Sequence, residues 1–164
     1  MSELIDLVDD QGIIVRPRVL RDDAAYYEGL YMPIVIVVVM NSYGQILVHK
    51  RAETKRVHGG AIDHICGAIV SGETPEAAAH REALQETGVR LSDLTLIRQG
   101  VNSYGRYCRL IRARSDDTPA GNLNPREVAW AAFHTTTDLY SWRAAGESFV
   151  HGFFEDLNYA LTTR

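Results

Sequence analysis

Gly-Ala-Ile-Val-Ser-Gly-Glu-Thr-Pro-Glu-Ala-Ala-Ala-His-Arg-Glu-Ala-Leu-Gln-Glu-Thr-Gly-Val occupies residues 67–89, and this stretch predicts a short strand, a loop and one helix. The hydroxyl of Thr74 can cap the first turn, and Pro75 suits the first helical position, where its missing N–H costs nothing. The alanines and the leucine that follow favour helix. Gly88 supplies the left-handed residue at which such a helix stops.

Glu82 and Glu86 lie four residues apart on this helix, with Gln85 between them, so the three side chains share one face. Two carboxylates held this close repel each other unless a positive charge lies between them. Mg²⁺ binds oxygen ligands and substrate phosphates together. The helix therefore predicts a site for a hard divalent cation, Mg²⁺ or Mn²⁺.

The same stretch resembles the Nudix box, which is a glycine, five residues, Glu, seven residues, and then Arg-Glu-aliphatic-x-Glu-Glu-x-Gly-aliphatic. Two positions depart from this pattern, since Ala83 replaces a larger aliphatic residue and Gln85 replaces the first Glu of the Glu-Glu pair. The positions that match at the expected spacing are Gly67, Glu73, Arg81, Glu82, Glu86, Gly88 and Val89.

The resemblance implies a hydrolase that cleaves a nucleoside diphosphate or another organic diphosphate linked to a further group. It makes Glu82 and Glu86 carboxylate ligands of the metal, with the backbone carbonyl of Gly67 facing the same ion. Gln85 would coordinate through its neutral amide oxygen, so we expect fewer or weaker metal ions than with a third carboxylate. The sequence does not identify which diphosphate is the substrate.

Other roles also follow from the resemblance. Glu73 and Arg81 would pair with each other and fix the loop against the helix, a structural and not a chemical role. The general base is open, because families of this fold use different positions. Glu127 begins a predicted strand and could reach the site, but it could equally be a solvent-facing or arginine-paired acid. Glu82 or water on the metal could serve instead.

Basic residues gather between a predicted strand end and the box. Arg51 and Lys55 are the two that match diphosphate-binding positions in the Nudix branch containing isopentenyl-diphosphate isomerase. Arginine can grip phosphate through two parallel hydrogen bonds. We therefore expect Arg51 and Lys55 to bind the diphosphate, although a solvated basic loop is the other interpretation.

Two alternative functions remain open. The isomerase also has a cysteine before the box glycine, like Cys66, but it needs a histidine where Ala68 stands and acids in a strand that here, over 104–113, has none. A double-bond shift needs two proton-transfer groups, so isomerisation is disfavoured. A catalytically weak protein that only binds nucleotides is the second alternative, motivated by Gln85. Metal-dependent phosphate release would separate an enzyme from a binder.

Composition sets the broad class. The chain has 164 residues, which suits one domain over residues 1–164, with 46% hydrophobic and 23% charged residues as in ordinary globular proteins. A net charge of −4 predicts no affinity for nucleic acid or anionic membranes. The longest apolar run, 32–40, is too short to span a bilayer, and the start Met-Ser-Glu-Leu-Ile-Asp lacks a basic signal-peptide region. We expect a cytoplasmic protein, with a homodimer as a common state of the fold.

Hydrophobic periodicity predicts strands alternating with a few helices, and hence an α/β/α sandwich with a mixed β-sheet, as in the Nudix fold. We expect a hairpin over 3–20, a short helix or loop over 21–31, and Trp130 in the core. The C-terminal helix over 147–161 would bury a stripe of Phe149, Phe153, Leu157 and Leu161. The remaining expected elements are strands at 33–40, 45–51, 64–70, 91–100, 103–113 and 127–134, helices at 75–87 and 135–145, and loops at 52–63 and 115–122.

Overall fold

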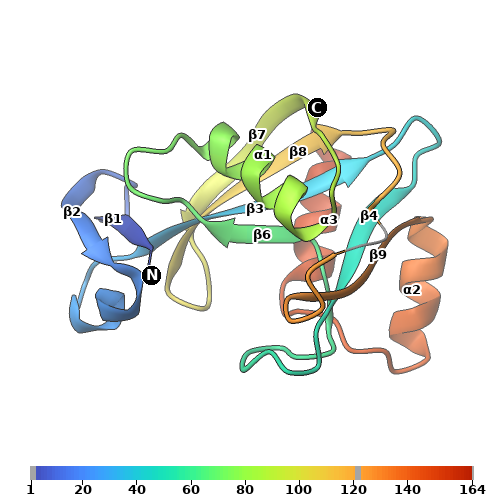
Figure 1. Cartoon of the computed structure of the whole chain (residues 1–164). Helices are drawn as coiled ribbons and strands as arrows, with labels where there is room; N and C mark the ends of the chain where they lie inside the picture. The colour runs from blue at the N-terminus through green and yellow to red at the C-terminus, as the bar shows by residue number, and fades with distance from the viewer. Residues whose placement is uncertain (1–2, 121–122, 164) are drawn as a thin grey trace.

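A mixed seven-stranded sheet forms the middle layer of the molecule (Figure 1). The computed structural model describes residues 3–120 and 123–163, so Gly121 and Asn122 of the predicted loop lie outside the described residues. Helix α1 (Pro75–Glu86) covers one face of the sheet and α3 (Phe153–Thr162) covers the other, which confirms the predicted α/β/α sandwich. The strands of the sheet are β3 (Met32–Met40), β4 (Ile46–Arg51), β5 (Ile62–Asp63), β6 (Ile65–Ala68), β7 (Ser92–Val101), β8 (Arg106–Arg114) and β9 (Val128–His134).

Strand β3 is the centre of this sheet. It pairs in parallel with β8 and antiparallel with β6, while it meets β4 only at the Met40↔Ile46 pair. Strand β4 then diverges and pairs antiparallel with β9 and β5, and β7 lies antiparallel to β8 at the other edge. Because β3 and β4 separate beyond their shared turn, β6 and the helix that follows it are inserted beside the central strand.

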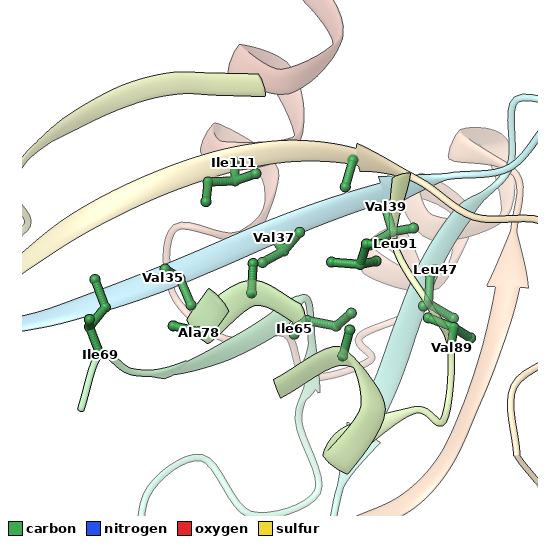
Figure 2. Packing of buried hydrophobic residues seen from close by; sticks show 13 residues of the cluster. Val35, Val37, Val39, Leu47, Ile65, Ile69, Ala78, Val89, Leu91 and Ile111 are labelled. Atoms are coloured by element: carbon green, nitrogen blue, oxygen red, sulfur yellow. The ribbon is translucent and has the colours of Figure 1, made fainter. Parts of the chain in front are cut away.

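The apolar run of β3 accounts for its central position, because the strand is buried on both faces. Val35, Val37 and Val39 are fully buried and face α1, where they meet Ile111 of β8 and Ala78 of α1 (Figure 2). On the opposite face of β3, Val38 packs with Phe153 and Leu157 of α3, and Ile36 and Met40 lie against the same cluster. Small alanines on α1 let the helix lie close to the sheet, and this close packing brings its polar edge against β6.

Two smaller units flank the sandwich. The predicted hairpin is present as β1 (Leu4–Val8) and β2 (Ile14–Leu20), and a 3₁₀ helix over Arg21–Tyr26 follows it (Figure 1). At the opposite end, α2 (Thr136–Ala144) begins with a capping box between Thr135 and Asp138. Within residues 3–120 and 123–163, no helix is both long and apolar enough to cross a membrane.

The C-terminal segment differs from the prediction. The helix begins at Phe153 and not at residue 147, because Gly152 takes the left-handed conformation and residues 148–150 bond to Ile62 as an extended segment. Ile62–Asp63, predicted as loop, forms strand β5, because it pairs antiparallel with His49 and Lys50 of β4. Of the predicted stripe, Leu161 is 43% exposed and does not join the core. Trp130 is half-buried and packs beside Trp142.

Candidate active site

A cavity of about 1010 Å³ opens beside α1, where the helix passes the free edge of β6. Thr74 caps the helix by accepting a hydrogen bond from the Ala77 N–H, as the sequence predicts, and the helix starts at the proline. Glu82, Gln85 and Glu86 all line the cavity together with Gly67. The structure therefore brings the three polar residues of the helix face to one place.

Arg81 ties the loop, the strand and the helix together. Its guanidinium donates to both oxygens of Glu73, at 2.9 and 2.8 Å, and to the carbonyl oxygen of Ala68 at 2.8 Å. It also bonds Glu82 Oε1 at 2.5 Å. Although burial raises the pKa of Glu73, the hydrogen bonds from Arg81 and the Val70 N–H lower it below its usual range. The predicted Glu73–Arg81 pair is thus formed, and it extends to Glu82.

Glu86 is the carboxylate of the helix face with the least favourable surroundings for a negative charge. Its side chain is only 15% exposed, and its Oε2 accepts a hydrogen bond from the Cys66 N–H at 3.2 Å. Burial raises its pKa well above the usual range, and the neighbouring carboxylates Glu82 and Asp63 raise it further. No lysine or arginine bonds it in the part of the chain that the structure describes. A carboxylate in this setting either takes up a proton or is ionised with an added cation beside it.

Three other buried ionisable residues, His49, Asp63 and His64, lie outside the box, and the box spacing does not point to them. His49 on β4 is 1% exposed, its Nδ1 lies 3.8 Å from Glu86 Oε2, and burial lowers its pKa to about 3. Burial lowers the pKa of His64 to about 4, and its Nε2 donates to the Phe153 carbonyl at 3.1 Å. Burial raises the pKa of Asp63 to about 7. Both histidines are therefore neutral at physiological pH.

The basic residues predicted to bind diphosphate also line the cavity. Arg51 bonds Asp63 Oδ2 at 3.5 Å and the Val57 carbonyl at 3.3 Å, so a buried acid and a loop carbonyl orient its guanidinium. Lys55 forms an ion pair with Glu127, which lies just before β9. The suggested base Glu127 therefore reaches the cavity, and it is the acid partner of a cation there.

The oxygen atoms around α1 fit a hard divalent ion. In residues 3–120 and 123–163 no three His, Cys, Asp or Glu side chains converge on one point, since Glu82 is bonded to Arg81 and a glutamine stands at position 85. The remaining oxygens are those of Glu86, the Gln85 amide and the Gly67 backbone. Burial raises the pKa of the Cys66 thiol well above its usual range, so sulfur does not compete as a thiolate.

Comparisons with known proteins agree on one family. A family model described as the NUDIX domain matches residues 30–157. A Nudix hydrolase of Deinococcus radiodurans is 29% identical over 153 residues, covering 90% of this chain and 87% of that protein. A Nudix hydrolase of Listeria monocytogenes is 30% identical over 133 residues, covering 76% and 75%. A crystal structure from Deinococcus radiodurans has a TM-score of 0.77 at 28% identity, covering 96% of this chain and 99% of that one.

Proposed function

Because this chain belongs to the Nudix family and is a hydrolase of diphosphate bonds, we propose that it cleaves a nucleoside diphosphate derivative or another small organic diphosphate with the help of Mg²⁺. One observation carries the metal dependence. Glu86 is a buried carboxylate without a cationic partner among the described residues, and it lies beside Glu82, Gln85 and Gly67 in one cavity. Divalent metal dependence is general in this family.

The ion would be held by Glu86, the Gln85 amide oxygen and the Gly67 carbonyl, with Glu82 joining when it leaves Arg81. When bound, it supplies positive charge against the diphosphate and lowers the pKa of a water molecule. Arg81 keeps the loop and helix in register through Glu73.

Arg51 and Lys55 approach the same cavity and would bind phosphate oxygens. Phosphate would compete with Glu127 for Lys55, and this competition would free the Glu127 carboxylate to accept a proton. Glu82 remains the other candidate base.

Hydrolysis is favoured over isomerisation by what surrounds Cys66. Strand β8 carries no Asp or Glu, and Ala68 stands where the isomerase-like branch needs a metal-binding histidine. The likeness to that branch is confined to Cys66, Arg51 and Lys55. Homodimer formation, a single domain, a cytoplasmic location and no binding of nucleic acid or membrane stay predictions from the sequence.

A panel of organic diphosphates tests the proposal. The purified protein is incubated with nucleoside diphosphates, nucleotide sugars and prenyl diphosphates, with Mg²⁺, with Mn²⁺ or with a chelator, and the products are measured. We expect metal-dependent release of phosphate-containing halves from at least one compound. Isomerised prenyl diphosphate would favour the alternative enzyme, and tight binding without any product would favour a nucleotide-binding protein.

Removal of the basic groups should weaken substrate binding. We expect Arg51→Ala and Lys55→Ala each to raise KM by a factor corresponding to about 1–3 kcal/mol, typical of charge-assisted hydrogen bonds. Arg56→Ala is the matched control, because Arg56 is exposed in the same loop and does not line the cavity. Steady-state kinetics at saturating Mg²⁺ measure the effect. Equal KM values in all three variants and the parent would show that the loop does not bind the diphosphate and is a solvated basic surface.

Restoring the third carboxylate should strengthen metal binding. We expect Gln85→Glu to raise the rate at limiting Mg²⁺ by about tenfold, because it adds a charged ligand beside Glu82 and Glu86. Without metal, repulsion among the three carboxylates should lower the free energy of unfolding by a few tenths of a kcal/mol, and the melting temperature should fall slightly. Added Mg²⁺ should reverse that loss. Leu84→Glu is the control, because it adds the same charge one residue away, outside the cavity lining. It should leave both the Mg²⁺ dependence of the rate and the Mg²⁺ dependence of the melting temperature unchanged. An unchanged Mg²⁺ dependence in Gln85→Glu would mean that position 85 does not face the metal.

A further inference from the structure

The cavity extends well beyond the residues that would bind diphosphate. At about 1010 Å³ it is as large as pockets that enclose drug-sized ligands, which measure roughly 300–1,000 Å³. Its floor includes Met32, Ile34 and Ile36 of β3, which are apolar. The remaining volume therefore suits an organic group that is attached to the diphosphate.

Asp156 lines the end of this cavity from the first turn of α3. Its carboxylate has no hydrogen-bond or ion-pair partner in residues 3–120 and 123–163, although burial raises its pKa to about 6. Arg98, the cation whose charge acts on it, is engaged elsewhere. Arg98 Nη1 donates to Glu155 Oε1 at 2.9 Å, and its guanidinium lies 4.4 Å from the centre of the Tyr159 ring. Asp156 is thus a half-buried acceptor that lacks a donor.

An aromatic rim lies next to Asp156. Tyr104, in the turn between β7 and β8, stands nearly perpendicular to the ring of His151, with ring centres 5.4 Å apart. His151 precedes Gly152, the cap residue of α3, and Asp156 Oδ2 lies 3.8 Å from the position that a Cβ on Gly152 would take, so His151 and Asp156 border the same part of the cavity. Aromatic side chains of this kind hold flat rings by stacking.

We infer that Asp156 accepts a hydrogen bond from an N–H group on the organic part of the substrate, such as the amino group of a nucleobase, and so selects which diphosphates are cleaved. The inference rests on the proposed function. A prenyl chain would leave the half-buried carboxylate without a donor, which costs free energy. A ring that offers only acceptors would place oxygen or nitrogen lone pairs against it. An amino group on a flat ring satisfies both Asp156 and the aromatic rim.

Two pairs of ribonucleoside diphosphates test this selection. Adenosine and purine-riboside diphosphates differ only in the amino group, and so do cytidine and 2-pyrimidinone-riboside diphosphates. We expect the parent to prefer the amino-bearing member of at least one pair by about tenfold in kcat/KM, as for a hydrogen bond to a charged group. Asp156→Ala should remove most of that preference. Asp156→Asn, which keeps an acceptor oxygen, should restore part of it.

Asn158→Ala is the control, because Asn158 is exposed on the same helix and does not line the cavity. If Asp156 only stabilises the first turn of α3, Asp156→Ala will lower the melting temperature and affect both members of each pair equally, which overturns the inference.

Calorimetric Kd values for the same four compounds separate the inference from the proposed function. An amino preference in binding that Asp156→Ala removes would support the inference even if no compound is hydrolysed. Hydrolysis of diphosphates with no amino preference in rate or binding, or failure of every amino-bearing compound to bind, would overturn it.

Discussion

Glu86→Gln should abolish most metal-dependent hydrolysis and at the same time stabilise the metal-free protein. We expect kcat to fall by at least about a hundredfold, because a charged ligand worth several kcal/mol of transition-state stabilisation becomes a neutral one. The fold should survive, since the amide oxygen of the introduced glutamine can still accept the hydrogen bond from the Cys66 N–H. Activity at saturating Mg²⁺ measures the first effect.

Thermal and denaturant unfolding with a chelator present measure the second effect. The folded state raises the pKa of Glu86, so the unfolded chain loses this proton more readily. Stability therefore falls as the pH rises above about 4.3, the ordinary pKa of Glu, and it stops falling above the folded-state pKa. Removing the charge should raise the free energy of unfolding by about 1 kcal/mol or more. Glu76→Gln, on the exposed first turn of α1, is the control and should change neither quantity much. A fully active and unstabilised Glu86→Gln variant would refute the assignment of Glu86 as the buried metal ligand.

Gly67→Ala should inactivate the enzyme and leave it folded. A Cβ at position 67 would overlap the side chain of Glu82 from its Cγ to its carboxylate, which packs directly on the glycine. The whole side chain must move aside, so we expect a loss of about 1–3 kcal/mol in stability. The displaced carboxylate would leave the site, and activity should fall by about a hundredfold, as when a group near the metal is misplaced.

Ala68→Gly is a matched change at the next residue of β6 and should lower stability without this loss of activity. The decisive comparison is activity against melting temperature for the two variants. A Gly67→Ala enzyme with normal turnover would show that the close approach of Glu82 to β6 has no role in the reaction.

Local patterns in the sequence were enough to predict α1, the central strand and the sandwich. The apolar run of β3 and the Thr74-Pro75 start of α1 are local signals. They predict a strand and a helix start without any knowledge of the residues that pack against them. Clustering of Glu82, Gln85 and Glu86 follows from helical spacing in the same way.

Features that depend on distant partners were not predictable. The helix after residue 147 starts late because Val150 bonds to Ile62, and the helical periodicity carries no trace of that bond. Asp63 and His49 gain their significance only when β4 and β5 pair beside Glu86. The Lys55–Glu127 ion pair likewise joins two loops that are far apart in the sequence.

The parallel pairing of β3 with β8 has a consequence for how the chain reaches its native state. The partners, from Met32↔Arg106 to Met40↔Arg114, are distant in sequence, and α1 lies between them. Long-range pairing of this kind forms slowly, because closing the long loop between the two strands costs chain entropy before the contacts between the strands form. Until residue 114 leaves the ribosome, the uncharged segment Ile34–Met40 lacks one of its strands and is a template for aggregation. The strand that packs against α1 is therefore also the segment most in need of protection during synthesis.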